Sequence, residues 1–159
     1  MTTPNIHIMP LKRLLSLTAV PADAVAVISS SYPVQPGKIP IPHTAACYQD
    51  RDDESAQSFS PEQAGQFAAF VKNSNAKEIY VCCDAGQSRS PAIAAALRRY
   101  FGQDELAIWR DPAYHPNALC YRRMCQALGI CVTDQEMDRR IYISRTAFRA
   151  AIQTARAKR

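Results

Sequence analysis

The 159-residue sequence predicts an α/β fold, with a central and mostly parallel sheet of four to five strands flanked by helices. Short apolar runs alternate along the chain with stretches of helical spacing, which is typical of crossover connections between parallel strands. The run Val25 to Ser29 is continuous in its apolar character, as expected of a strand that is covered on both faces. After Gly102 only helical patterns remain, so the C-terminal half should be helical.

Three further strands are expected along the chain. Asn5 to Met9 alternates between polar and apolar residues and stops at Pro10. Thr44 to Tyr48 is a plausible strand despite its alanines, and Glu78 to Cys82 contains a short β-favouring apolar run. Between the second and third strands, Ser30 to Pro42 holds four prolines and a glycine and should be irregular.

Helical spacing and capping signals predict the helices. Ser60 and Gln63 form a possible capping box around a proline at the first helical position. Asn117 can cap a helix that Gly129 ends. In the last helix we expect Phe148, Ala151, Ile152 and Ala155 to face inward. The expected helical segments are Leu11 to Leu17, a helix from Ser60-Pro61, a helix opened by Pro91, a short turn at Asp104 to Ile108, Asn117 to Leu128, and Asp138 to Ala157.

Length and composition predict one domain spanning residues 1–159. The hydrophobic fraction of 47% and the charged fraction of 21% are ordinary for a globular protein. No segment approaches the roughly 18 to 20 apolar residues of a membrane span. The stretch from Met1 to Asn5 lacks the basic and apolar regions of a signal peptide, so a cytoplasmic location is expected.

The net charge of +5 suits an anionic substrate and leaves nucleic acid open as a partner. Aromatic residues are not interleaved with the basic clusters at Arg139-Arg140 and 156–159, so sequence-specific RNA binding has little support. Adjacent Cys82-Cys83 favours reduced thiols over disulfides. The spacing of Cys120, Cys125 and Cys131 matches no common zinc pattern, and we expect no metal or cofactor.

One stretch, Val81-Cys82-Cys83-Asp84-Ala85-Gly86-Gln87-Ser88-Arg89-Ser90-Pro91, joins a strand end to a helix start. Five residues separate Cys83 from Arg89. A loop this short that enters a helix N-terminus turns backbone N–H groups inward and adds the positive end of the helix dipole. The sequence therefore predicts an anion cradle made of Asp84, Ala85, Gly86, Gln87, Ser88 and Arg89.

The side chains of this stretch suit nucleophilic chemistry on an oxyanion. Cys83 lies where amides, dipole and Arg89 favour the thiolate, and such cysteines titrate at about 3.5 to 7.5 instead of near 8.5. Arg89 supplies a planar fork for two oxygens of a tetrahedral oxyanion. Gly86 allows a positive φ or close approach to the ligand, and the hydroxyls of Ser88 and Ser90 can donate. The missing lysine argues against a nucleotide-binding P-loop.

The pattern Cys83-x5-Arg89-Ser90, with Gly86 three residues after the cysteine, resembles the signature loop of the protein tyrosine phosphatase superfamily. It is most similar to the dual-specificity branch, because the low-molecular-weight branch has its loop near the N-terminus. The resemblance implies a compact three-layer fold and hydrolysis of phosphotyrosine, with or without phosphoserine and phosphothreonine, through a phosphocysteine intermediate. Phosphoinositides and RNA 5′-phosphates stay open as substrates. The histidine that usually precedes the nucleophile is Cys82 here.

This chemistry needs a proton donor for the leaving group, and the acidic loop before the Ser60 helix is the expected source. In the dual-specificity branch, the resemblance implies an aspartate about thirty residues before the cysteine. Asp50, Asp52 and Asp53 lie 33, 31 and 30 positions before Cys83, so the spacing does not choose. We favour Asp50, directly after a strand, over Asp52. Asp84 is a weaker candidate because it belongs to the loop itself.

Other interpretations of Cys83 also exist. A rhodanese-type sulfurtransferase also places a cysteine on an anion-binding turn, but has no use for the acidic loop. A phosphate-binding module without turnover is a third possibility. A protease-like pair of Cys83 with His43 or His115 leaves Arg89 without a purpose.

Overall fold

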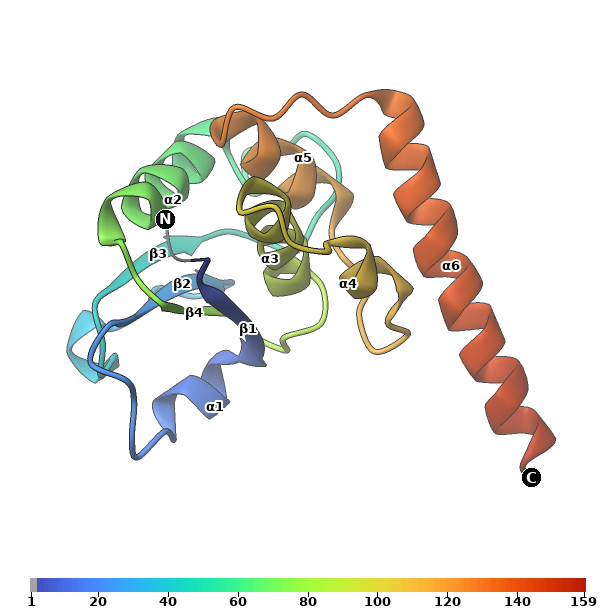
Figure 1. Cartoon of the computed structure of the whole chain (residues 1–159), viewed down its shortest axis with the longest axis horizontal. Helices are drawn as coiled ribbons and strands as arrows, with labels where there is room; N and C mark the ends of the chain where they lie inside the picture. The colour runs from blue at the N-terminus through green and yellow to red at the C-terminus, as the bar shows by residue number, and fades with distance from the viewer. Residues whose placement is uncertain (1–2) are drawn as a thin grey trace.

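The computed structural model describes residues 3–159 and has an α/β architecture around a four-stranded, all-parallel sheet (Figure 1). The strand order is β1-β4-β2-β3, so β4 and β2 are central. The predicted fold class is confirmed. The strands are β1 (Asn5–Pro10), β2 (Ala24–Ser30), β3 (His43–Cys47) and β4 (Glu78–Cys83).

Helices cover both faces of the sheet, as the sequence predicts. Figure 1 shows α1 on one side of the strands and α2, α3 and α5 on the other. The segment 31–42 is irregular apart from one 3-10 turn. The helices are α1 (Leu11–Leu15), α2 (Pro61–Ser74), α3 (Arg89–Tyr100), α4 (Leu106–Arg110), α5 (Ala118–Ala127) and α6 (Asp134–Ala157).

The alternation of side chains along the strands divides the core in two. In β2, Val25 and Val27 belong to the large core beneath α2, α3 and α5, while Ala26 and Ile28 pack with Leu14 of α1. Every residue of β2 is buried, as predicted for a doubly covered strand. In β4 the same alternation places Cys82 in the smaller core, so Cys83 turns to the opposite face of the sheet.

Two predicted helix starts are confirmed at the level of single hydrogen bonds. The amide of Gln63 donates to Ser60 Oγ at 3.1 Å, and the amide of Ser60 donates to Gln63 Oε1 at 3.0 Å. Asn117 Oδ1 accepts from the amide of Cys120 at 3.0 Å. Gly129 follows α5 with a positive φ of 81°, as expected for a glycine that ends a helix.

Several predicted boundaries were wrong. Helix α3 begins at Arg89 instead of Pro91, which is its third residue, where a missing N–H still costs no hydrogen bond. Helix α6 begins at Asp134 instead of Asp138, because Thr133 and Glu136 form a capping box. Helix α1 stops at Leu15. The turn predicted at 104–108 is the short helix α4.

The inward face predicted for the last helix was also partly wrong. Phe148 is 42% exposed and Ala155 is exposed, whereas Ala151 and Ile152 are partly buried. The buried side chains of α6 are Met137 and Arg140, both in its first two turns. The physical reason is visible in Figure 1, where the C-terminal end of α6 extends beyond the other elements.

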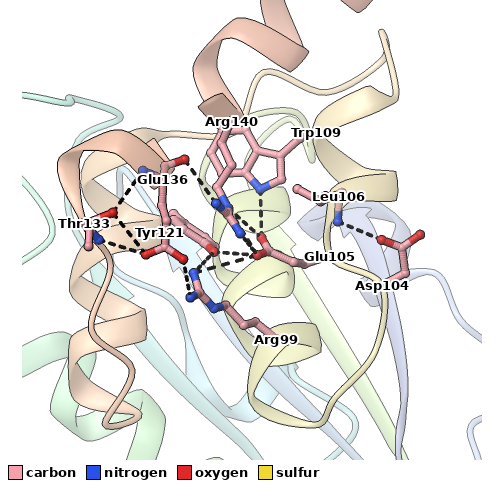
Figure 2. Close-up of polar contacts among 9 residues, drawn as sticks. All are labelled: Arg99, Asp104, Glu105, Leu106, Trp109, Tyr121, Thr133, Glu136 and Arg140. Atoms are coloured by element: carbon pink, nitrogen blue, oxygen red, sulfur yellow. Dashed lines mark hydrogen bonds and ion pairs between the residues drawn. The ribbon is translucent and has the colours of Figure 1, made fainter. Parts of the chain in front are cut away.

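A buried polar network fixes the first turns of α6 (Figure 2). Its centre is the carboxylate of Glu105, which accepts from Trp109 Nε1 at 3.1 Å, from Tyr121 Oη at 2.8 Å and from the Arg140 guanidinium. Arg99 adds an ion pair to Glu136 at 2.8 Å. The network thus connects α3, α4 and α5 to α6. No helix of the described residues is long and apolar enough to cross a membrane.

Candidate active site

The predicted anion loop lies at the carboxyl end of the sheet. Strand β4 ends at Cys83, helix α3 begins at Arg89, and the five residues between them form the connection. Because β4 is a central strand, the ends of its neighbours β1 and β2 lie on either side of this loop. Carboxyl ends of parallel strands are the usual ligand sites of open α/β sheets.

Gly86 has the positive φ that the sequence predicts, and it is also in close contact with the backbone of β1. Its φ of +70° is the positive value expected. The close approach, however, is to the end of β1 and not to a ligand. A Cβ at this position would lie 2.7 Å from the backbone nitrogen of Pro10 and 2.9 Å from the carbonyl carbon of Met9. The tip of β1 therefore excludes any side chain at residue 86.

The segment before α5 holds the loop from outside. The amide of His115 donates to the carbonyl of Gln87 at 2.8 Å, and the amide of Asn117 donates to the carbonyl of Ser88 at 3.1 Å. On the inner side, the amide of Gly86 donates to Cys83 Sγ at 3.2 Å. The amides of Ala85, Gln87 and Ser88 donate to no residue within the described part of the chain. The loop thus has free donors for an anion.

The sulfur of Cys83 is buried beside this loop and accepts from its Gly86 amide. Only 2% of Cys83 is exposed. The Ser90 hydroxyl is 3.1 Å from Sγ, close enough to donate to a thiolate. Together with the Gly86 amide, it gives the sulfur two hydrogen-bonding neighbours. Cys83 and Ser90 are therefore brought together as the sequence predicts.

The guanidinium of Arg89 is buried, with 5% of the residue exposed. Its Nη1 donates to Ser31 Oγ at 3.0 Å and to the carbonyl of Tyr48 at 2.8 Å. Its Nη2 donates to Asp84 Oδ2 at 2.8 Å. Its Nε is buried and has no partner in residues 3–159. An unpaired donor on a buried cation is costly, so this nitrogen marks a place for an acceptor.

The side chain of Asp84 turns toward Arg89 and the residues that follow β2. Its carboxylate, 37% exposed, accepts from Ser30 Oγ at 2.9 Å and from the amide of Ser31 at 3.0 Å, in addition to Arg89. Partial burial raises the pKa of Asp84, but the hydrogen bonds from Ser31, Arg89 and Ser30 outweigh it and lower the pKa below its usual value. Asp84 is therefore an anion beside Arg89 at neutral pH.

The three acidic-loop candidates separate clearly in space. Asp50 Oδ1 accepts from Ser88 Oγ at 2.9 Å and from Asn117 Nδ2 at 2.8 Å, so Asp50 borders the loop. Asp53 is instead turned to Arg51, with contacts of 2.8 and 2.6 Å, and hydrogen bonding by Arg51 lowers its pKa. Asp52 lines a neighbouring pocket. Of the three aspartates, Asp50 is the one that forms a hydrogen bond with the anion loop.

This pocket, of about 390 Å³, lies beside the loop and is lined by Ser88 of the loop and by Asp50, which borders it. Its opposite wall comes from α6 and includes Ile141, Ser144 and Arg145. The site accordingly opens toward the last helix. The remaining lining residues come from the acidic loop, α4 and the start of α5, namely Asp52, Trp109, His115, Pro116, Asn117 and Ala118.

Sequence reasoning missed three residues of this site, namely Ser31, Tyr48 and Asn117. Tyr48 places its ring 5.7 Å from the Arg89 guanidinium, and its hydroxyl donates to Ser29 Oγ at 2.6 Å. Ser31 and Tyr48 directly follow β2 and β3. A rule that looks for polar residues just after strand ends would have found both. Asn117 was recognised only as a helix cap.

Among the described residues, no other cysteine and no histidine forms a hydrogen bond with the Cys83 sulfur. Burial, and then the charge of Cys83, raise the pKa of Cys82 to about 12. Burial likewise raises the pKa values of Cys120 and Cys125 to about 12. Among residues 3–159, no group of three His, Cys, Asp or Glu side chains could hold a metal ion. His43 begins β3 and binds the carbonyl of Ile41, and the His115 ring packs on Phe148, so neither is paired with Cys83.

The sequence was compared with protein-family models and with curated proteins. No protein-family model matches the chain, and no curated protein matches it significantly.

Proposed function

We propose that the protein is a cysteine-dependent phosphatase that hydrolyses phosphomonoesters, phosphotyrosine above all and phosphoserine or phosphothreonine in addition. One observation carries the proposal, namely the buried and unpartnered Nε of Arg89 in the loop that also holds Cys83. A tetrahedral oxyanion bound there supplies the missing acceptor. It also meets the free amides of Ala85, Gln87 and Ser88.

In the first step, the Cys83 thiolate attacks phosphorus. A sulfur–phosphorus bond forms while the bond from phosphorus to the ester oxygen breaks, and the leaving oxygen takes a proton from a carboxylic acid. The loop amides and Arg89 stabilise the charge that gathers on the equatorial oxygens.

In the second step, water attacks the phosphocysteine. The same carboxylate accepts a proton from the water, the sulfur–phosphorus bond breaks, and inorganic phosphate leaves. The Ser90 hydroxyl, 3.1 Å from Sγ, stabilises the departing thiolate. Both steps need one carboxyl group that changes its role.

Asp50 is the acid that we propose. Ser88 and Asn117 both donate to its Oδ1, which leaves Oδ2 without a partner in the described residues and able to carry the proton. Asp52, on the rim of the adjoining pocket, is the second candidate.

The test is the hydrolysis of para-nitrophenyl phosphate. We expect Cys83→Ser to lower the rate by about 10³-fold or more, because the nucleophile is lost. Arg89→Ala should do the same, and Arg89→Lys, which keeps a charge but not the fork, should stay far below the wild type. Cys131→Ser, which changes an exposed cysteine, is the matched control and should retain full activity. Full activity of Cys83→Ser would refute the mechanism.

A phosphate-binding module without turnover is the second candidate. It is favoured by the ion pair of Arg89 with Asp84, since this pair occupies a donor that would otherwise meet the phosphate. Saturable binding of a phosphopeptide by the wild type, with no release of phosphate over many hours, would decide for this candidate.

A further inference from the structure

The last helix carries a row of unpaired arginines that begins in the pocket beside the loop. Arg145 lines this pocket together with Asp50 and Ser88. Arg149 and Arg156 follow at i+4 and i+11, which places all three on one face of α6. We call Arg145, Arg149 and Arg156 the arginine row. None of them forms an ion pair with another described residue, in contrast to Arg99 and Arg140 of the Glu105 network.

Nothing in the second half of α6 balances this charge. From Arg139 to the end of the chain there is no Asp or Glu, while Arg149, Arg156, Lys158 and Arg159 are exposed. Figure 1 shows the C-terminal end of this helix extending beyond the other elements. A row of uncompensated cations on such a helix is complementary to an extended anion.

The charged side chains that line the pocket are distributed unevenly. Its carboxylates, Asp50 and Asp52, come from the acidic loop, whereas Arg145, the one cation among its described lining residues, comes from α6. No ion pair joins Arg145 to either aspartate among residues 3–159. A substrate whose phosphate lies in the loop would therefore be repelled from the acidic side if it carried further negative groups, and attracted to α6.

The apolar residues of α6 argue against a lipid surface as the ligand. Phe148 is in edge contact with the His115 ring at 4.8 Å, and Ile141 packs against the core. Beyond Phe148 only Ile152 and several alanines remain, which is too little apolar area for a helix that lies in a membrane interface.

We propose that Arg145 and Arg149 bind acidic side chains of an extended phosphopeptide, so that the preferred substrate carries Asp or Glu near its phosphorylated residue. This inference rests on the proposed function. Residues four apart on a helix are separated by about 6 Å along its axis. Alternate side chains of an extended peptide, which lie on the same side, are separated by about 6.6 Å. The two spacings match.

The test compares two phosphotyrosine peptides of equal length that differ only in having two glutamates or two glutamines, spaced two residues apart, on one side of the phosphotyrosine. We expect the wild type to have a kcat/KM several-fold higher for the acidic peptide. Exposed ion pairs are weak, so Arg145→Gln and Arg149→Gln should each reduce this ratio by about twofold to fivefold. The double variant should bring it close to one. Raising the salt concentration to 0.5 M should weaken the preference in the wild type.

Arg139→Gln is the matched control. It removes the same charge from an exposed position of α6 that lies off the arginine row, so the ratio should not change. A ratio of one in the wild type, or a ratio unaffected by loss of both arginines, overturns the proposal. So does a single-stranded oligonucleotide with a 5′-phosphate that is preferred over the acidic peptide and loses that preference in the double variant.

Binding of the same peptides by fluorescence anisotropy separates this inference from the proposed function. If the acidic peptide binds more tightly through Arg145 and Arg149 but is not hydrolysed, the arginine row is supported and the phosphatase activity is contradicted. If both peptides are hydrolysed at equal rates, the activity is supported and the arginine row is contradicted.

Discussion

At the scale of single residues, Asp84 both stabilises and restrains the site. It neutralises the buried Arg89 while taking up its Nη2 donor. We expect Asp84→Asn to release this donor and to lower the inhibition constant of inorganic phosphate several-fold, measured by competition with para-nitrophenyl phosphate. An unchanged or weakened inhibition would show that the carboxylate is needed to orient the guanidinium.

Asp84 also predicts a pH dependence of stability. Its pKa is lowered in the folded protein, so its contribution is fully present above the unfolded value of about 3.9 and is lost as the pH falls through the folded value. The difference in unfolding free energy between wild type and Asp84→Asn should be about 1 kcal/mol at pH 6, since the carboxylate is partly screened by solvent. Urea unfolding should show this difference to be constant above about pH 5 and to shrink as the pH falls below about 4.

The burial of the cysteines leads to a prediction that can be tested without an activity assay. Cys82, Cys120 and Cys125 are buried with pKa values of about 12, whereas Cys47 and Cys131 are exposed. At pH 7.5, iodoacetamide should label the two exposed cysteines in the folded protein and leave those three unlabelled. Peptide mass spectrometry reads the result, and labelling in urea gives the control in which all become reactive.

Much of the candidate site follows from local sequence. The spacing from Cys83 to Arg89 and the nearby serines were sufficient to predict the loop, and the structure brings Cys83, Ser90 and Gly86 together. Ser31 and Tyr48 could not be found in this way, because they meet Arg89 only through the pairing of β2 with β4 and of β3 with β2.

At the scale of elements, the start of a helix was predicted correctly where its capping residues were recognised in the sequence. Ser60 and Gln63 form both hydrogen bonds of a capping box within four consecutive residues, so the start of α2 could be predicted from the sequence. The start of α6 was placed four residues late because apolar spacing begins only at Met137, although Thr133 and Glu136 carried the same capping pattern. The start of α3 was placed late because a proline suggests the first helical position.

The cap of α2 can be tested directly. Ser60→Ala removes the acceptor for the Gln63 amide and should lower the free energy of unfolding by about 1 kcal/mol. The midpoint of thermal unfolding should then fall by about 2 to 4 °C. Thr146→Ala, at an exposed position inside α6, is the control and should leave the midpoint unchanged or slightly higher.

At the scale of the whole molecule, the placement of α6 was beyond sequence reasoning. Its apolar residues suggested an inward face around Phe148, yet the anchor is a charged side chain, Arg140. A buried arginine paired with a glutamate thirty-five positions earlier leaves no periodic pattern that a reader of the sequence could recognise. The packing of Leu128 and Val132 then leads the chain into this contact.

Breaking the Glu105 network should therefore have a large effect. Arg140→Met leaves the buried carboxylate of Glu105 without its closest cation and should cost about 3 to 5 kcal/mol of unfolding free energy. The double variant Glu105→Gln with Arg140→Met should recover part of this loss, because no uncompensated charge remains. Equal destabilisation of the single and double variants in urea unfolding would mean that the pair contributes through packing alone.

The strand order has a consequence for folding during synthesis. Strand β1 pairs only with β4, which leaves the ribosome about 70 residues later, and at about 5 to 20 residues per second this delay lasts several seconds. Since the tip of β1 presses against Gly86, the loop after β4 cannot reach its final packing until β1 and β4 have paired. The packing around the Cys83 sulfur is thereby completed only after the chain from β1 to β4 has been synthesised.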